Sequence, residues 1–312
     1  MSTWESIGPR AQDGGPAARA NLEHILAAGK RSIWVTSGTG ASWMTEDGGR
    51  TWKYVELVSK RTEVGGLLFL DDRAGWLVGA MGGKAVVAST FDAGKNWEFK
   101  HSVVEFHTSV LSDMQFFSKK AGIAVGGGEF DAGPRSLIAV TSDGGATWKN
   151  TLLKTDDPQP VLRRVLYQSK SLIWASGGKS IYLSKDGGAS WQLRYRDTDA
   201  VDLTSLAIVD GTGIFAVGGW GLVLRSRDSG GTWEKVKLPP TVTKQYLSAI
   251  TFSDASHGWI CGDHGTILST KDGGDTWQEE ATGRSELLRS VAVLGNQVFA
   301  VGDGLIVIRR PI

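Results

Sequence analysis

The sequence predicts an all-β protein in which seven four-stranded blades form one β-propeller and the N-terminal strand completes the last blade. Three observations support this prediction. A tryptophan-containing motif recurs along the chain, two apolar patterns recur in register with it, and the last repeat ends before its fourth strand. Self-similarity at a period of about 40–45 residues is typical of propeller blades. We therefore expect residues 1–312 to form a single domain, with blade 7 built from about 286–312 plus 2–8.

The first observation is a motif of the form S/T-x-D-x-G-x-T/S/N-W, which begins at Thr45, Thr90, Thr141, Ser184, Ser226 and Thr270. Its aspartates are Asp47, Asp92, Asp143, Asp186, Asp228 and Asp272. A polar, glycine-containing segment between two short apolar runs indicates a hairpin turn. We therefore place each motif between the third and fourth strands of a blade.

Two further patterns occur seven times each, once more than the motif. The pattern L-x-x-φ-x-φ, with φ apolar, begins at Leu22, Val64, Leu111, Leu162, Leu203, Leu247 and Leu288. A short apolar run that usually ends in glycine contains Trp34, Trp76, Ile123, Trp174, Phe215, Trp259 and Phe299. Alternating apolar residues with glycine at the ends are typical of strands. These patterns predict the first and second strands of seven blades.

The missing seventh motif predicts how the ring closes. In three blades the motif begins 11 residues after the strand-2 aromatic, as from Trp34 to Thr45. The same count from Phe299 reaches Arg310, and the sequence stops at Ile312. Residues 3–7 begin with Thr-Trp, as fourth strands do elsewhere, so we expect them to complete blade 7. This pairing removes an open sheet edge.

The six aspartates have two possible roles, as catalytic or metal-binding carboxylates or as turn residues. A short Asp side chain accepts hydrogen bonds from nearby backbone N–H groups and stabilises a tight turn. Glycine supplies backbone angles that other residues resist. Six copies around a ring cannot converge on one substrate. We therefore interpret them as repeated structural turns, and we expect each motif tryptophan to enter strand 4 and pack against a blade.

Composition excludes several classes of function. The net charge of +1 gives no general reason to expect nucleic acid or an anionic membrane as partner. The single cysteine, Cys261, excludes an internal disulfide and a cysteine-based zinc site, and we expect it to be a buried strand residue. No metal-ligand spacing or nucleotide-binding motif stands out, so neither a metal nor another cofactor is expected.

The segment from Met1 to Gly15 lacks the pattern of a secretory signal, and no apolar run is long enough to span a membrane. As written, the sequence predicts a cytoplasmic protein. Removal of a natural leader would instead indicate the periplasm or a lumen.

A binding site is expected where the first strands start, because polar residues there face the mouth of the central channel. These positions carry three arginines, a histidine and two carboxylates. They are Arg163, Arg164, Arg289, His24, Glu23 and Asp113. The hairpins between strands 2 and 3 lie on the same face and add Trp220, His264 and Arg135. The alternative is that the charged groups merely pair with one another across the channel.

The hairpin of blade 3, residues 126–135, is longer than its equivalents and contains Asp131. This insertion explains most of the wide spacing between Asp92 and Asp143. An insertion on the expected binding face is a candidate recognition element.

The repeated motifs resemble the Asp box, also called the BNR repeat, and the whole-chain pattern resembles the Ycf48-like photosystem II assembly factors. The resemblance implies a non-catalytic scaffold that holds an unassembled polypeptide, with an arginine patch involved. We expect the chain to be a monomer. Arg163, Arg164 and Arg289 are the candidates here. A guanidinium cluster suits an acidic segment or a carboxylate tail.

Two alternatives share the Asp box. Sialidases need three arginines, a tyrosine–glutamate pair and an acid/base aspartate. This chain lacks their Arg-Ile-Pro motif, and no tyrosine sits beside a glutamate at a first-strand start. A glycan-binding module would stack an exposed aromatic such as Trp220 on a sugar, but Trp220 has no equivalent in the other hairpins. The sequence favours a protein or peptide partner and leaves a glycan open.

Overall fold

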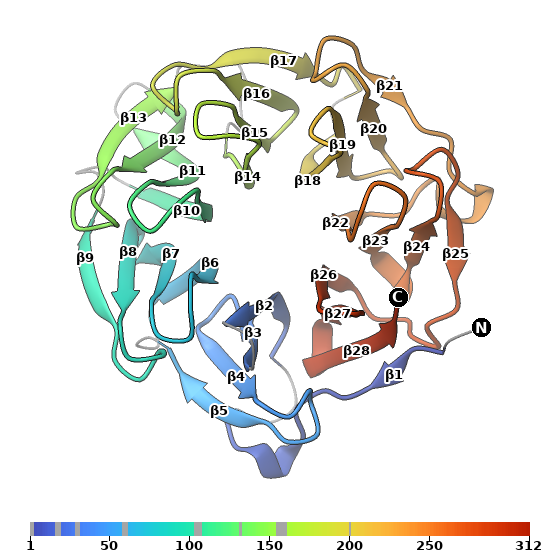
Figure 1. The fold of residues 1–312 in the computed structure, drawn as a ribbon, viewed down its shortest axis with the longest axis horizontal. Coiled ribbons are helices and arrows are strands. Elements are labelled where there is room, and N and C mark those ends of the chain that lie inside the picture. The colour runs from blue at the N-terminus through green and yellow to red at the C-terminus, as the bar shows by residue number, and fades with distance from the viewer. Residues whose placement is uncertain are drawn as a thin grey trace.

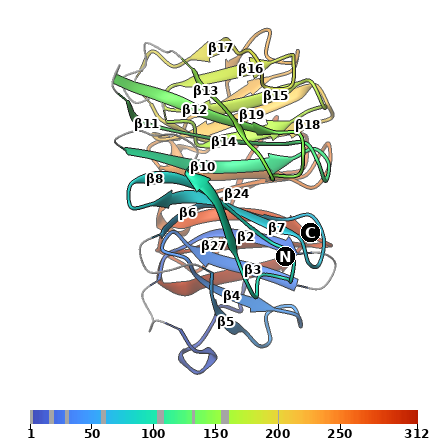
Figure 2. The same ribbon diagram turned by 90° about the vertical axis from the view of Figure 1, so that its left-hand side faces the viewer.

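The computed structural model describes residues 3–15, 20–28, 32–57, 62–102, 108–130, 133–153, 161–199 and 201–312. Within these residues the chain forms seven four-stranded antiparallel sheets arranged around a central channel (Figure 1). The first strand of each sheet lies innermost, and the fourth strand forms the rim. Figure 2, turned by 90°, shows the blades from the side of the disc. The predicted seven-bladed propeller is confirmed.

The blades follow one another along the chain. Blade 1 contains β2 (Leu22–Ala28), β3 (Ser32–Ser37), β4 (Ala41–Thr45) and β5 (Lys53–Glu56). Blade 2 contains β6 (Thr62–Phe69), β7 (Gly75–Met81), β8 (Lys84–Thr90) and β9 (Glu98–Ser102). Blade 3 contains β10 (Thr108–Phe116), β11 (Gly122–Phe130), β12 (Gly133–Thr141) and β13 (Lys149–Leu153). Blade 4 contains β14 (Arg164–Tyr167), β15 (Ile173–Gly177), β16 (Ser180–Ser184) and β17 (Gln192–Arg196).

The remaining blades have the same order, except that the last takes its outer strand from the N-terminus. Blade 5 contains β18 (Leu203–Val209), β19 (Gly213–Gly218), β20 (Val223–Ser226) and β21 (Glu234–Lys235). Blade 6 contains β22 (Leu247–Phe252), β23 (Gly258–Gly262), β24 (Ile267–Thr270) and β25 (Gln278–Glu280). Blade 7 contains β26 (Leu288–Leu294), β27 (Gln297–Gly302), β28 (Ile306–Pro311) and β1 (Glu5–Ser6). Short 3₁₀ turns are η1 (Ala11–Asp13), η2 (Pro240–Val242), η3 (Asp263–Gly265) and η4 (Asp303–Leu305).

The Asp boxes form the turns between the third and fourth strands, as predicted. In blade 1 the backbone N–H groups of Arg50 and Thr51 donate to the Asp47 carboxylate at 3.0 and 2.9 Å. The Thr45 hydroxyl donates to the same carboxylate at 2.8 Å and accepts from the Gly49 N–H at 2.9 Å. Each carboxylate thus organises its own loop. The predicted position of the tryptophan was off by one residue, because Trp52 precedes strand β5.

The glycine at the fifth position of each box packs against the neighbouring blade. Gly230 has φ of 75°, and a Cβ placed on it would lie 2.2 Å from the ring of Trp174 in blade 4. Gly274 stands in the same relation to Phe215, at 2.4 Å. The box therefore needs glycine for its backbone angle and for this close approach. The strand-2 aromatics belong to the hydrophobic clusters between blades, and Trp174, Trp259 and Phe215 are at most 1% exposed.

The predicted ring closure is confirmed. Strand β1 pairs with β28, with Glu5 opposite Arg309 and Ser6 opposite Ile308 (Figure 1). The Ile7 N–H donates to the Val307 carbonyl at 2.9 Å. The first and last segments of the chain therefore share one sheet. Residue 2 of the predicted segment lies outside the described residues.

The insertion in blade 3 lengthens two strands. Strands β11 and β12 stay paired out to Phe130 and Gly133, so the added residues extend the sheet. Arg135 lies within β12, opposite Gly128, and not in a hairpin loop as predicted. Asp131 lies outside the described residues. Cys261 is fully buried in β23, as predicted. In the described part of the chain, no helix is long and apolar enough to cross a membrane.

Candidate functional site

A cavity of about 880 Å³ opens at the end of the channel where the first strands start. One position in every blade lines it, directly after the first residue of the L-x-x-φ-x-φ pattern. These seven residues are Glu23, Gly65, Ser112, Arg163, Thr204, Ser248 and Arg289. The cavity wall therefore carries different chemistry in each blade, although the fold repeats.

A β-bulge explains why these residues face the channel. In six blades the pairing of strands 1 and 2 shifts by one residue at this position, as between Leu22 and His24. A bulge redirects a side chain that regular alternation would place elsewhere. In blade 4 the position precedes β14, and the Arg163 N–H donates to the Ser176 carbonyl at 2.7 Å. The bulge thus presents a ring of side chains to the channel.

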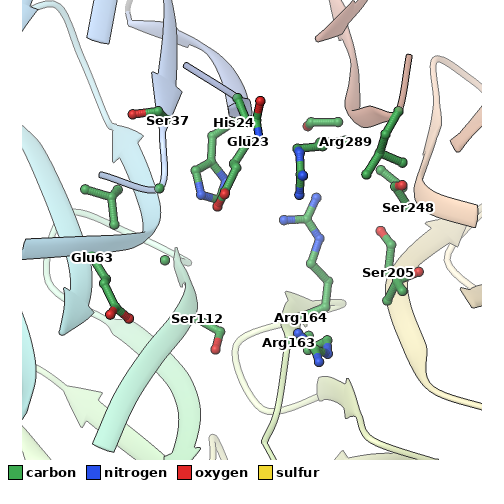
Figure 3. Close-up of a pocket in the computed structure, with 18 of the residues that line it drawn as sticks. Glu23, His24, Ser37, Glu63, Ser112, Arg163, Arg164, Ser205, Ser248 and Arg289 are labelled. Atoms are coloured by element: carbon green, nitrogen blue, oxygen red, sulfur yellow. The ribbon is translucent and has the colours of Figure 1, made fainter. Parts of the chain in front are cut away.

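The three candidate arginines have different environments. Arg164 lies 3.7 Å from the Asp113 carboxylate, and Arg289 donates to Asp303 at 2.5 Å. Arg163 is exposed and makes no ion pair within the described part of the chain. The side chains of Arg164 and Arg289 point toward one another across the opening (Figure 3). The expected pairing of charges across the channel accounts for Arg164 but leaves Arg163 available.

Glu23 and His24 lie together on the wall of blade 1 (Figure 3). Burial raises the pKa of Glu23, and nearby Arg289 opposes this rise. Burial lowers the pKa of His24 to about 4, and the positive charge of Arg164 adds to this effect. His24 is therefore neutral at pH 7, and its buried Nε2 has no hydrogen-bond partner among the described residues. The neutral imidazole therefore lies close to the positive charge of Arg164.

The sequence analysis missed several residues that line the cavity, among them Glu63 and Tyr246. Each comes directly before the first residue of the repeated pattern. Glu63 faces the cavity from β6 (Figure 3) and contributes to the raised pKa of Glu23. Burial raises the pKa of Tyr246, although the charges of Arg163 and Arg289 oppose the rise. Tyr246 is therefore close to both arginines and keeps its proton.

Four predicted site residues do not line the cavity. Asp113 is buried behind the wall, where its carboxylate accepts from the Val165 N–H at 2.9 Å and burial raises its pKa. Arg135 lies in the extended sheet of blade 3. His264 lies in η3 and contacts Gln245 through Nδ1 at 2.9 Å. Trp220 lies in the hairpin between β19 and β20 and is 70% exposed.

The chemistry of the cavity suits binding of an anionic group. Guanidinium groups bind carboxylates through paired, charge-assisted hydrogen bonds. A sialidase-like mechanism would require a tyrosine next to a glutamate, and no hydrogen bond joins Tyr246 to a glutamate within the described residues. The same part of the chain contains no group of three or more His, Cys, Asp or Glu side chains placed to hold a metal ion.

Sequence comparison shows a likeness to Ycf48 over part of the chain. The family model of the photosynthesis system II assembly factor YCF48 matches residues 226–310. The photosystem II assembly lipoprotein Ycf48 of Synechococcus sp. (strain CC9902) is 25% identical over 212 residues, which are 67% of this chain and 59% of that relative. The chain is a seven-bladed Asp-box propeller similar to Ycf48. The alignment covers less than two thirds of the relative's length.

Solved structures extend the likeness in fold to the whole chain. A structure described as YCF48 bound to D1 peptide has a TM-score of 0.75 and 18% identity, and the match covers 100% of this chain and 96% of that one. YCF48 from Cyanidioschyzon merolae also has a TM-score of 0.75, with 17% identity and 99% of both chains covered. At these identities the structures show the shared fold alone. The Ycf48-like fold predicted from the motifs is thereby confirmed.

Proposed function

We propose that this Ycf48-like propeller is a non-catalytic assembly scaffold that binds a partner polypeptide at the arginine-bearing mouth of its channel. The observation that carries the proposal is Arg163, which is exposed, has no ion-pair partner among the described residues and lines the same cavity as Arg289 and Tyr246. An acidic side chain or a terminal carboxylate of the partner would bind these guanidinium groups. Each charge-assisted hydrogen bond contributes about 1.5–3 kcal/mol.

The similarity to Ycf48 supports a polypeptide as the ligand. One solved Ycf48 structure is described as bound to D1 peptide, so an extended segment is a suitable occupant for a propeller of this shape. We include in the proposal that the chain acts as a monomer. The relative in Synechococcus is named a lipoprotein. A periplasmic or lumenal location fits this role, and the compartment of the present chain stays a prediction.

The proposal is tested with a fluorescein-labelled acidic peptide that has a free C-terminal carboxylate. Fluorescence anisotropy is measured for the wild type and for the double variant Arg163→Gln, Arg289→Gln. We expect the double variant to bind at least about tenfold more weakly, because two charge-assisted contacts are lost. A peptide with asparagine, glutamine and a C-terminal amide should bind poorly to both proteins.

The matched control is Arg50→Gln, Arg73→Gln, which makes the same change in net charge. Arg50 lies in an Asp-box loop, and Arg73 lies in the turn between β6 and β7, away from the channel mouth. If this control weakens binding as much as the channel variant does, the attraction is a general charge effect and the proposed site is wrong. A wild type that binds neither peptide would also refute the proposal.

A further inference from the structure

Trp220 occupies a backbone position that favours glycine. Its φ is 54°, in the left-handed region, where a bulky side chain is strained. The hairpins of blades 6 and 7 place His264 at φ 55° and Gly304 at φ 71° at the same point of the turn. Blade 7 therefore has a glycine here, which adopts this backbone angle without strain. Blade 5 instead has a tryptophan that is 70% exposed. A strained, exposed aromatic is a reason to search for a binding role.

The turn does not need the tryptophan side chain in order to fold. The Gly219 N–H donates to the Asp202 carbonyl at 3.2 Å, and the Gly221 N–H donates to the Gln245 carbonyl at 2.7 Å. The Leu222 N–H closes the turn by donating to the Gly219 carbonyl at 3.0 Å. Backbone contacts thus fix the hairpin from both sides.

A second cavity, of about 350 Å³, lies next to this indole. Its apolar wall consists of Val201, Leu222, Val223 and Val236. Among the residues that line it, Lys235 donates to Asp199 at 2.7 Å, so the charges of these two side chains are paired with one another. A sugar would need free hydrogen-bonding groups beside the aromatic ring. The lining therefore favours an apolar occupant over a glycan.

The small cavity adjoins the channel mouth through Tyr246. A Cβ placed on Gly219 would lie 3.6 Å from Val201, in the small cavity, and 3.7 Å from the ring of Tyr246. Tyr246 itself lines the large cavity near Arg163 and Arg289. A polypeptide held by the arginines can therefore continue over Tyr246 and reach Trp220.

We infer that Trp220 and the cavity beside it bind an apolar side chain of the polypeptide whose acidic group occupies the channel mouth. This inference rests on the proposed function for its polypeptide partner. It adds a second contact point, which selects a sequence in which an apolar residue lies near an acidic one. Aromatic anchors that bind in this way are common at the centres of protein interfaces.

The first experiment tests the small cavity without the channel site. N-acetyl-leucinamide is titrated into ¹⁵N-labelled protein, and the indole N–H signals are followed by NMR. The variant Trp220→Gly assigns the Trp220 signal and suits the backbone of the turn, as Gly304 does in blade 7. We expect a saturable shift of the Trp220 signal in the wild type, which also persists in the Arg163→Gln, Arg289→Gln variant. No shift, or a shift caused only by methyl glucoside, would overturn the inference.

The second experiment tests the link between the two contact points. The acidic peptide probe is compared with a set that carries one leucine at two to six residues from the acidic end, and with serine controls. At one spacing the leucine should tighten binding to the wild type by about 30-fold, as expected for an anchor worth about 2 kcal/mol. Trp220→Gly should abolish that gain while it still binds the serine peptide.

The outcomes separate the inference from the proposed function. A leucine gain that survives in Trp220→Gly, or no gain at any spacing, overturns the inference even if the arginines bind the acidic end. Loss of Trp220 binding together with a lower melting temperature would indicate a structural role, because the glycine variant should be at least as stable as the wild type. If the acidic peptide binds the Arg163→Gln, Arg289→Gln variant as tightly as the wild type, the proposed function is refuted, whatever the NMR titration shows.

Discussion

The N-terminal strand should contribute measurable stability through one buried side chain, Ile7. This residue is 9% exposed and packs with Trp52, Phe299 and Val307 in the cluster between blades 7 and 1. A Cβ placed on Gly49 would lie 2.5 Å from the Ile7 Cδ1 atom, so the side chain fits closely over the Asp box of blade 1. Replacing Ile7 by alanine removes this contact and leaves the backbone pairing intact.

The size of the effect follows from general magnitudes. Truncation of a buried isoleucine to alanine costs about 2–5 kcal/mol, and we expect about 3 kcal/mol here. For a chain of 312 residues the unfolding entropy is about 0.65 kcal/mol per kelvin. The melting temperature of Ile7→Ala should therefore fall by about 5 °C. Deletion of residues 1–8 should lower it further, because it also removes the β1 pairing and the Trp4 indole that donates to Glu280 at 2.9 Å.

Differential scanning calorimetry at one fixed scan rate measures both changes. The matched control is Glu5→Ala in the same strand, where an exposed carboxylate pairs with Arg309 at 3.1 Å. Exposed ion pairs contribute about 0–1 kcal/mol, so this variant should melt within about 2 °C of the wild type. An Ile7→Ala protein that melts with the wild type, or a Glu5→Ala protein that loses as much, would refute the role of Ile7 in closure.

Three further predictions concern the Asp boxes and the cysteine. Burial keeps the pKa of Cys261 at about 12, so Ellman's reagent should not react with the native protein at pH 8 and should react once urea unfolds it. Hydrogen bonds lower the pKa of Asp186 and of Asp228 to about 2 from an ordinary value of 3.8. Their contribution to stability is complete above about pH 4 and is lost as the pH falls toward 2, and calorimetry across this range should show it. Gly230→Ala should cost about 1–3 kcal/mol in urea denaturation because its Cβ would overlap Trp174, whereas Ser229→Gly, at φ 56°, should change stability by about 0.5 kcal/mol or less.

The fold could be predicted from the sequence because each blade repeats the same physical requirements. A turn that needs an aspartate and a glycine recurs with a buried aromatic in strand 2, and the structure shows these features in contact between neighbouring blades. Gly230 on Trp174 and Gly274 on Phe215 are examples. The missing last motif predicted ring closure for the same reason, since an incomplete repeat leaves one sheet edge unpaired.

The candidate site could be predicted only in part. The residue after the first apolar residue of each repeat lines the channel as expected. Glu63 and Tyr246 come directly before the repeated pattern, which gives no signal at that position, so they were missed. The β-bulge at the start of the first strand, as in blades 2 and 6, is also absent from the pattern. A bulge depends on pairing between strands, which a pattern within one strand does not report. For the same reason Asp113, two residues after Leu111, was expected at the mouth but lies buried behind it.

The two faces of the propeller follow different sequence rules. On the Asp-box face the repeated residues fix the loop geometry and pack between blades. Asp47, which accepts a hydrogen bond from the Thr51 N–H, is an example. At the channel mouth the seven equivalent first-strand positions hold a glutamate, a glycine, three hydroxyl residues and two arginines. The fold fixes the position of these side chains but not their type. The positive charge of this ring comes from the arginines of blades 4 and 7, near Tyr246, and its negative charge comes from the glutamate of blade 1. A ligand that binds the ring must be complementary to this distribution of charge.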